Sequence, residues 1–335
     1  MNRAITSALL LLVLAAPAAG QSKTGTTVGQ FLLIEPSARA AAMGNAGTTM
    51  FEEVESAFYN PGALGRLTRS GAQFTYASWL AGVAYNHAAT AIRIGDANTL
   101  LLSVTSLNSG EIDVRTVDQP LGTGERYEVA DLALGFGFGR RLTDRFSAGI
   151  QVKYLRESIW HSAMSSVAID FGVQYQLPFG SYLGASLSNF GGRSRFDGRD
   201  LRVRYDQDPD RYGDNSSVPA ALRTEDYPLP IIFRVGIGVP VLLNDYARAV
   251  FVVDALQPSD NTQSVSFGTE WMFFDALALR AGYQNLFQED SAFGLTLGSG
   301  LSHRFASNFG FAFDYAWAAH QYLGDTHRFT VGVSF

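Results

Sequence analysis

FGFAFDYAW, residues 309–317, has an aromatic ring at every second position. The residues between the rings are small, apart from one carboxylate: Gly310, Ala312, Asp314 and Ala316. Successive side chains of a β-strand point to opposite faces of the sheet. The stretch therefore predicts a strand with one bulky apolar face and one small face that carries a single charge.

The same period of two recurs from Gly71 to the end of the chain. Residues 328–335, 231–239 and 167–175 alternate in the same way. Division of the chain at its turn signals predicts about fourteen strands. They begin near Gly71, Val83, Ala97, Glu125, Asp144, His161, Ser181, Pro228, Asp245, Asn261, Asp275, Ser291, Ser307 and Thr326.

The small faces of these strands carry isolated charges. On the lipid face of a transmembrane barrel, a Lys or Arg at mid-membrane costs roughly 2–4 kcal/mol. A polar lumen instead offers water, opposite charges or an internal segment of the chain. We therefore expect the following charges to face the lumen: Arg93, Asp131, Lys153, Asp170, Arg234, Glu270, Arg280, Asp314 and Arg328.

A soluble β-sandwich is the alternative fold, with the aromatic faces packed against each other as its core. The chain has 335 residues but only 11 prolines, and many long strands suit closure into a barrel, which leaves no open edge. Hydrophobic residues make up 47% of the chain and charged residues only 17%, as expected when one face of every strand contacts lipid. The predicted fold is all-β: a transmembrane antiparallel β-barrel over residues 71–335.

The predicted connections between strands differ in length. The two longest, 106–124 and 191–227, follow the third and seventh strands. If both ends of the barrel segment lie in the periplasm, these two loops lie outside the cell and the short connections lie in the periplasm. Outer-membrane barrels have this arrangement of short periplasmic turns and long outer loops.

Residues 1–20 have the pattern of a cleaved secretory signal. Arg3 supplies the positive charge, residues 4–16 form the apolar core, and residues 18–20 form a small-residue cleavage site. The following residues 21–31 are small and polar, and we expect a flexible start. The chain has no cysteine, which excludes disulfides and a lipid-anchored cysteine. These features predict an exported protein located in an outer membrane.

Residues 36–64, PSARAAAMGNAGTTMFEEVESAFYNPGAL, break the alternation. Residues 51–58 are long enough for two helical turns. Asn60 can cap a short helix that begins at Pro61, where the missing N–H costs nothing. We predict that residues 21–70 form a plug of coil and short helices inside the barrel. The plug motif residues are Met43, Gly44, Gly47, Phe58, Asn60 and Pro61.

Three short elements follow one another within the plug. They are Ser37-Ala38-Arg39-Ala40, Met43-Gly44-Asn45-Ala46-Gly47 and Ser56-Ala57-Phe58-Tyr59-Asn60-Pro61-Gly62-Ala63-Leu64. Together they resemble the N-terminus of the PorV/PorQ family, which belongs to the wider FadL-like group of outer-membrane barrels. The Asn-Pro-Ala step of that family reads Asn60-Pro61-Gly62-Ala63 here, a small departure. The resemblance implies a barrel architecture more directly than it implies a particular biochemical function.

The resemblance also implies a role in type IX secretion, where family members receive or hold exported cargo at the cell surface. The contact surface would be the loop 193–227, which is rich in both signs of charge. The implied partners are outer-membrane lipid, secreted cargo proteins and subunits of the secretion complex. The resemblance does not separate PorV-like from PorQ-like roles.

Two alternatives to cargo docking stay open. The first is a FadL-like channel for hydrophobic small molecules, which needs an apolar pocket under the outer loops. Candidate lining residues are Phe196, Tyr205, Tyr212, Ile112 and Val114. The second is a structural barrel that a plug seals permanently.

The chain ends on an apolar strand. Phe329, Val331, Val333 and Phe335 share one face of it. This pattern resembles the terminal signal by which outer-membrane barrels are recognised for insertion. The barrel-insertion machinery is therefore a further expected partner.

No residue pattern predicts catalysis, a cofactor or a metal site. The five histidines are scattered, and the acidic run Asp206, Asp208 and Asp210 lacks the Gly and Glu that a calcium loop needs. His161 beside Ser162 is the one pair that merits inspection for catalysis. The net charge of −6 argues against nucleic acid as a partner. We expect no enzyme and no cofactor.

Overall fold

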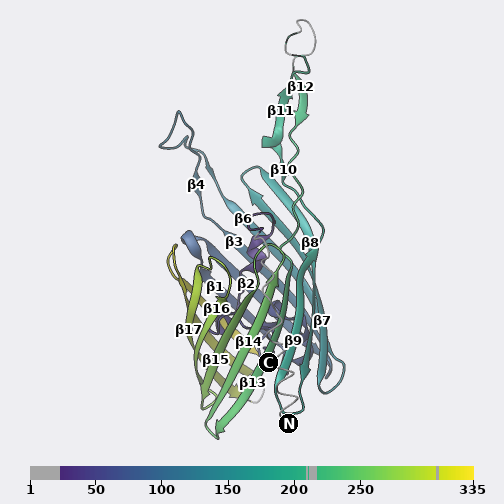
Figure 1. Ribbon diagram of the computed structural model, residues 1–335, viewed down its shortest axis with the longest axis vertical. Helices are drawn as coiled ribbons and strands as arrows, with labels where there is room; N and C mark the ends of the chain where they lie inside the picture. Colours follow the sequence, from purple (N-terminus) through teal and green to yellow (C-terminus); the bar gives the residue numbers. More distant parts are fainter. Residues whose placement is uncertain (1–22, 209, 211–216, 307–308) are drawn as a thin grey trace, which may run out of the picture.

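The computed structural model describes residues 23–208, 210, 217–306 and 309–335 (Figure 1). The predicted signal, residues 1–20, lies outside the described residues.

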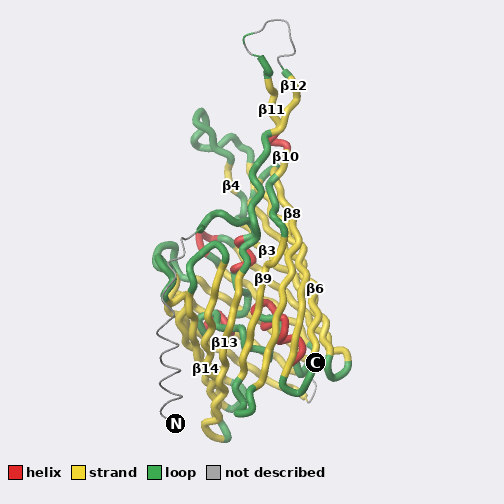
Figure 2. The backbone as a smooth tube through the Cα atoms, turned by 45° about the vertical axis from the view of Figure 1, so that its right-hand side comes forward, coloured by secondary structure: helices red, strands yellow, loops and turns green. Residues whose placement is uncertain are grey.

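Fourteen antiparallel strands form a closed barrel (Figures 1 and 2). The ring closes where β1 (Gly71–Ser78) pairs with β19 (Thr326–Ser334). The other wall strands are β2 (Ala84–Ile94), β3 (Asn98–Asn108), β6 (Val129–Arg141), β7 (Phe146–Ile159), β8 (Ser162–Gln176), β9 (Tyr182–Gly191), β13 (Ile232–Asn244), β14 (Ala247–Pro258), β15 (Ser264–Phe273), β16 (Leu277–Leu286), β17 (Phe293–Ala306) and β18 (Phe309–His320). The predicted all-β barrel is confirmed, and its predicted strand starts lie within a few residues of the observed ones. The start predicted at Ser307 lies just outside the described residues.

Strand β18 shows the two faces of the wall. Phe311 and Phe313 are 38% and 37% exposed on the outside, whereas Asp314 and Ala316 are 6% and 1% exposed on the inside. No second sheet covers the aromatic faces in the described part of the chain, so the sandwich alternative is wrong. An apolar outer face with a small, polar inner face is the arrangement of a membrane-spanning barrel.

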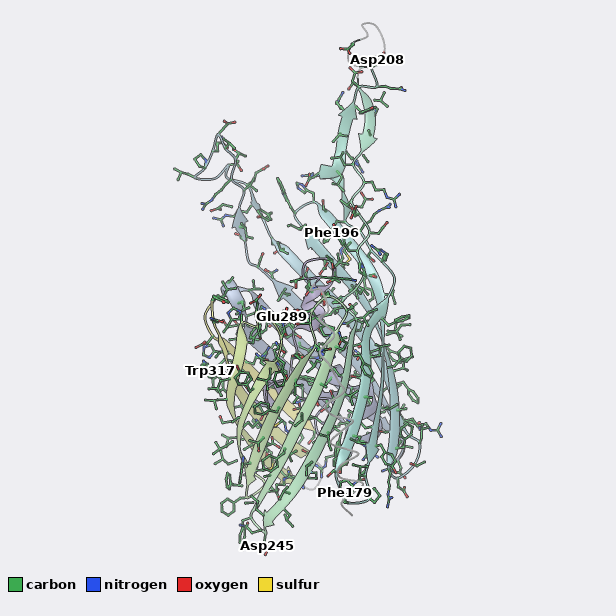
Figure 3. The ribbon with its side chains drawn as sticks, in the orientation of Figure 1. Phe179, Phe196, Asp208, Asp245, Glu289 and Trp317 are labelled. Carbon is green, nitrogen blue, oxygen red and sulfur yellow. The ribbon has the colours of Figure 1, made fainter. Side chains whose placement is uncertain are left out.

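The two ends of the barrel differ (Figure 3). Short connections join the strands at one end, which we call the turn end and which includes Phe179 and Asp245. The opposite end, the loop end, carries the longest connections, which include Phe196 and Asp208. The long connections and the short connections therefore lie at opposite ends of the barrel, as predicted from the sequence.

Two extensions project beyond the loop end (Figures 1 and 2). The short extension joins β3 to β6 and contains the paired strands β4 (Ile112–Asp113) and β5 (Arg126–Tyr127). The long extension joins β9 to β13. It contains β10 (Asp197–Gly198), which pairs with β8, the 3₁₀-helix η4 (Arg199–Leu201), and the ribbon of β11 (Arg202–Tyr205) and β12 (Val218–Ala221). Another 3₁₀-helix, η3 (Leu80–Gly82), lies between β1 and β2.

The N-terminal segment lies inside the barrel (Figure 2). Its elements are η1 (Gln30–Leu33), α2 (Ala38–Ala42), α3 (Ser56–Tyr59) and η2 (Pro61–Arg66). Two expectations about it are wrong. The start is not a free flexible segment, because Val28 and Phe31 are buried in an apolar cluster. Residues 51–58 do not form two helical turns. Among the described residues, no helix is long and apolar enough to cross a membrane.

The short length of α3 has a local cause. The backbone N–H of Glu55 donates to Gln73 Oε1 of the wall at 2.7 Å, and the Glu55 side chain accepts a hydrogen bond from Thr75 Oγ1, also at 2.7 Å. Contacts with the wall therefore fix the chain just before Ser56 and override its helical tendency.

Candidate functional site

The plug is held at both ends of the barrel. At the loop end, Val28 N donates to Pro228 O at 3.1 Å, and Thr27 Oγ1 donates to Asp260 Oδ2 at 2.7 Å. At the turn end, Phe335 N donates to Ser70 O at 2.9 Å. The segment from residue 27 to residue 70 therefore spans the lumen from one end to the other.

Asn60 forms three side-chain hydrogen bonds within the plug and to the wall. Its Oδ1 accepts from Gly62 N at 2.9 Å and caps η2, with Pro61 at the first position. Its Nδ2 donates to Thr48 O of the plug at 2.8 Å and to Val173 O of β8 at 2.9 Å. One buried side chain thus joins two parts of the plug to the wall.

The glycines of the plug allow close contact with the wall. Gly44 has φ 68°, and a Cβ there would lie 2.6 Å from Tyr283 O and 2.7 Å from Phe267 O, so the position needs glycine on both counts. Met43 is 1% exposed against the same strands. Gly47 packs against the ring of Tyr59, where a Cβ would lie 2.5 Å from the ring carbons.

Glycines of the wall complement those of the plug. A Cβ at Gly172 would overlap Asn60 Oδ1, and a Cβ at Gly149 would overlap Pro61 O. A Cβ at Gly282 would overlap Gly44 N. The bare inner wall is therefore shaped to the plug backbone.

A buried ion network joins α2 to β15, β16 and β18. Arg39 of the plug forms two bonds with Glu270, at 2.6 and 2.8 Å, and one with Glu52 at 2.8 Å. Arg280 donates to Glu270 at 2.6 Å and to Asp314 at 2.6 Å. Three of the expected lumen charges therefore meet here with one plug charge, and bidentate Arg–carboxylate contacts of this kind fix geometry strongly.

The other buried wall charges form smaller groups. Arg234 pairs with Glu35 of the plug at 3.1 Å. Lys153 pairs with Asp170 at 2.8 Å, and both contact Asn189, which has a left-handed backbone with φ 63°.

Arg328, Arg93 and Asp131 are placed differently from these pairs. Arg328 is 2% exposed, and its guanidinium lies 5.0 Å from the centre of the Trp79 ring. Arg93 lies at the turn end, where it donates to Thr68 O at 2.7 Å. Asp131 is only partly buried near the loop end and lies opposite Glu157 in the β6–β7 ladder.

Burial disfavours the charged form of several plug carboxyls. It raises the pKa of Glu35 despite the neighbouring Arg234. It also raises the pKa of Glu53, and it raises that of Glu55 well above its usual range, with the nearby Glu53 adding to the effect. Glu55 Oε2 is buried without a hydrogen-bond partner. Burial therefore makes ionisation of these three plug carboxyls costly even where an arginine lies nearby.

Apolar side chains fill the loop end of the lumen. Phe31 and Leu32 of η1 pack with Leu155, Tyr85 and Leu229, and partly buried side chains including Phe196 cover them. Of the residues expected to line a channel pocket, only Phe196 joins this cluster. Tyr205 and Ile112 lie on separate extensions, Val114 lies beside Ile112, and Tyr212 is outside the described residues. The pocket expected from these residues is therefore wrong.

One interior void lies between the plug and β2, β3 and β7. It has a volume of about 10 Å³, and its lining includes Glu55, Phe58, His87 and Gln151. The Phe58 ring meets the His87 ring edge-on at 6.1 Å. The void is large enough for about one water molecule.

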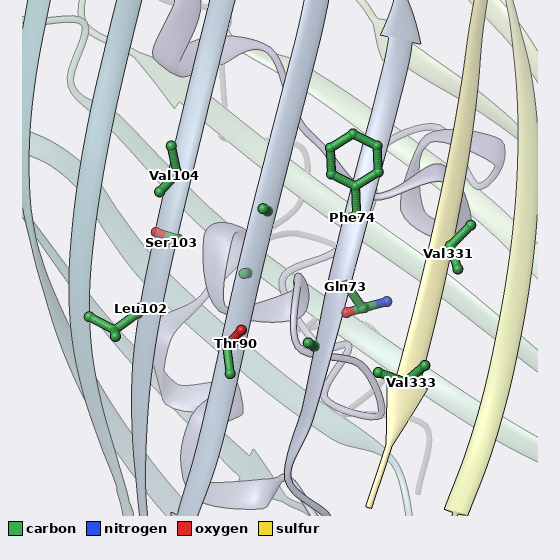
Figure 4. Close-up of a pocket in the computed structure, with 11 residues that line it drawn as sticks. Gln73, Phe74, Thr90, Leu102, Ser103, Val104, Val331 and Val333 are labelled. Atoms are coloured by element: carbon green, nitrogen blue, oxygen red, sulfur yellow. The ribbon is translucent and has the colours of Figure 1, made fainter.

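A larger hollow, of about 470 Å³, lies on the outer surface of the wall (Figure 4). Small residues at Ala72, Ala88 and Thr90 form its floor between larger side chains such as Phe74 and Leu102. It opens away from the lumen, so it is no part of a passage through the barrel.

The described residues contain no group of three or more His, Asp or Glu side chains placed to hold a metal ion. His161 contacts Asp200 of η4 at 3.0 Å and stacks on Trp160. It thus links the β7–β8 turn to the base of the long extension, and this contact gives His161 a structural role.

The sequence matches the family model "Type IX secretion system protein PorV" over residues 17–255. The chain belongs to the PorV family. No curated protein sequence matches it significantly.

Solved structures share the fold of this PorV-family barrel. The toluene transporter TbuX of Ralstonia pickettii has 11% sequence identity and a TM-score of 0.53, with 88% of this chain and 96% of that chain covered. A FadL homologue of Pseudomonas aeruginosa has 12% identity and a TM-score of 0.55, with coverages of 90% and 98%. The toluene transporter TodX of Pseudomonas putida has 12% identity and a TM-score of 0.55, with coverages of 88% and 96%. At these identities the likeness concerns the fold, which is that of FadL-like outer-membrane barrels.

The expected C-terminal signal residues lie on the outer face of this PorV-family barrel. Phe329, Val331 and Phe335 are 40%, 39% and 57% exposed, and Val333 lines the outer hollow. They occupy β19 and the residue directly after it.

Several residues that hold the plug were missed by the sequence reasoning. Glu35 and Arg39 anchor it by ion pairs, and Asp254 of β14 accepts from Thr48 N and Oγ1 at 2.9 and 2.7 Å. Gln174 donates to Thr48 O and Met50 O. A usable signal existed: the plug carries its own charges, and each buried charge requires an opposite charge or a hydrogen bond on the wall.

Proposed function

We propose that this PorV-family barrel acts in type IX secretion as a closed outer-membrane platform that docks exported proteins or subunits of the secretion complex through its two extensions. The observation that carries this proposal is the division of the molecule. Ion pairs and close backbone contacts lock the plug across the lumen, while the extensions reach beyond the loop end. In an outer-membrane barrel the loop end faces the cell exterior.

The proposal includes the route to the membrane. Residues 1–20 act as a cleaved export signal, and Phe329, Val331, Val333 and Phe335 are read by the insertion machinery. The plug motif and the lumen-facing charges hold the plug rather than bind a ligand. No catalytic step is part of the proposed function.

Shortening the long extension tests docking. Leu222 N donates to Leu201 O at 2.7 Å, and the Ser194–Tyr227 bridge closes the base, so residues 201–222 can be replaced by a short Gly-Ser turn without disturbing Phe196. We expect a host cell that carries only this variant to retain fewer exported proteins on its surface. The amount of barrel in the outer membrane should stay unchanged.

A companion variant removes the tip of the short extension, residues 116–122. It shows whether the short extension contributes to docking as well as the long one. Full surface retention in both variants, at normal barrel levels, would remove docking by the extensions from contention.

A second candidate function is passage of small apolar molecules. The apolar cluster of Phe31, Leu32 and Leu229 under the loops supports it, as does the shared fold with channels named for toluene transport. Uptake of toluene by cells with and without the barrel tests it. Equal uptake rates would eliminate passage, whereas faster uptake that a Leu155→Trp change slows would support it.

A further inference from the structure

The β11–β12 ribbon stands apart from the rest of the fold. It forms a separate two-stranded sheet, and no other strand in the described ranges pairs with it. Both of its edges project above the barrel (Figures 1 and 2). An isolated ribbon of this size has little stability of its own, and an unpaired edge is a template for another strand.

The two outer edges of the ribbon do not offer the same backbone hydrogen-bonding groups. Leu222 N bonds to Leu201 O, so in an antiparallel ladder the next pair, Arg202 with Ala221, turns its backbone groups outward. The same holds two residues further, for Arg204 with Pro219. Proline has no N–H to offer, so Pro219 interrupts the outer edge of β12. The outer edge of β11 has no such block.

The free groups on the β11 edge can be named. They are the N–H and C=O of Arg204 and the C=O of Arg202, since Arg202 N–H is already bonded to Arg199 O. In an antiparallel addition, these groups would bond one residue of the incoming strand and the residue two positions along.

The two faces of the ribbon differ in chemistry. Arg202 and Arg204 share one face, and no described carboxylate lies within 4.0 Å of either guanidinium, although Arg204 donates to Ser217 Oγ at 2.7 Å. The opposite face carries apolar side chains, of which Tyr205 and Val218 are 56% and 39% exposed.

We propose that the β11 edge takes up one β-strand from a protein partner, and that this strand carries acidic residues on one face and apolar residues on the other. Its acidic side chains meet Arg202 and Arg204, and its apolar side chains continue the face of Tyr205 and Val218. A second copy of this chain fits poorly, because β11 against β11 would set arginine against arginine. This inference rests on the proposed docking function and specifies its partner.

The test uses the full-length barrel in detergent and two fluorescently labelled peptides, Glu-Val-Glu-Val-Glu-Val-Glu and Lys-Val-Lys-Val-Lys-Val-Lys. We expect the barrel to bind the acidic peptide at least tenfold more tightly by fluorescence anisotropy. Binding should slow hydrogen exchange at the Arg204 amide and weaken as salt is added.

Three variants separate the contributions. The double variant Arg202→Glu/Arg204→Glu keeps the edge and should reverse the preference between the peptides. Arg204→Pro removes the free N–H and should abolish binding of both peptides. Arg223→Glu, at the exposed base of the extension, is the matched control and should bind like the parent.

Equal binding of the two peptides, or unchanged binding to Arg204→Pro, would overturn the inference. So would self-association of the barrel through the same edge. If shortening the extension abolishes surface retention in cells while Arg204→Pro retains it, strand addition is wrong and docking stands. If neither shortened extension reduces surface retention, docking itself is wrong.

Discussion

At the scale of single residues, the plug depends on a few buried polar side chains. Asn60 makes three hydrogen bonds, and Glu55 is 1% exposed with one carboxylate oxygen unpaired. A buried polar group that loses its partner costs its full desolvation energy, so these positions should respond strongly to small changes.

Asn60→Ala should destabilise the barrel by about 2 kcal/mol, because it removes a helix cap and leaves Thr48 O and Val173 O without this donor. Asn60→Asp is the informative comparison, since it keeps the oxygen that accepts from Gly62 N but loses the amide donor. Urea unfolding in detergent measures both. Unchanged midpoints and unchanged protease resistance of the plug would show that Asn60 does not hold it.

Glu55→Gln should stabilise the protein more as the pH rises. The folded-state pKa of Glu55 is raised above its unfolded value, so ionisation is disfavoured in the fold. Its cost is absent below the unfolded pKa of about 4.3 and grows until the pH passes the folded pKa. The variant should therefore gain little stability at pH 4 and progressively more as the pH rises towards 8.

Urea unfolding midpoints across this pH range check the Glu55 prediction. Glu125→Gln, on the exposed short extension, serves as the control and should leave the pH dependence as in the parent. A gain in Glu55→Gln that is the same at every pH would contradict the assigned cause.

At the scale of elements, the wall and the plug fit by backbone contact. The inner glycines Gly149, Gly172, Gly268 and Gly282 lie where plug atoms occupy the space of a side chain. The α2 helix is held by Arg39 and by Ala38 N, which donates to Thr330 Oγ1 at 3.1 Å. The contacts therefore come from both small residues and charges.

Gly282→Ala should displace the plug, because the new methyl group would overlap Gly44 N and Met43 backbone atoms. Overpacking of this kind costs about 1–3 kcal/mol. Limited proteolysis should then cut within residues 40–50 while the wall stays intact. Gly192→Ala is the control, since a Cβ there would meet nothing within 4 Å and would leave the contacts of the plug untouched. Equal protease resistance in the two variants would argue against the close fit.

The strands were predictable from sequence and the plug helices only in part. A strand that faces lipid on one side and a lumen on the other imposes a strict period of two, as residues 309–317 show. The helices of the plug are too short for a period, and their ends are set by contacts such as Glu55 N with Gln73 Oε1. Asn60 and Pro61 are the exception, because a cap followed by proline is a local signal.

At the scale of the whole molecule, the partners of each charge were beyond reach from sequence. The alternation placed Glu270, Arg280 and Asp314 on the inner side, and the structure brings them together with Arg39. Their meeting depends on strand registers and on a plug residue 231 positions away in the chain. No local pattern encodes such a distance. The extensions were found as long loops, but the β11–β12 ribbon within one of them was not.

The proposed closed platform predicts the behaviour of the molecule in a planar bilayer. The parent barrel should show no steady ion conductance in a planar membrane, because the plug fills the path. Arg39→Met removes the bonds between α2 and Glu270 and should give transient openings. Steady conductance of the parent, at the level of an open porin, would show that the plug is not a seal.

The attachment of the plug at both ends of the barrel constrains how the molecule is assembled. Threading the segment through a finished ring would carry the charges of Arg39 and Glu35 along the lumen before either had reached its partner on the wall. If the strands instead assemble around the segment, β1 and β19 pair last. Glu270 and Arg234 have by then formed their ion pairs with Arg39 and Glu35. The N-terminal segment would then act first as a template for closure of the barrel and afterwards as its plug.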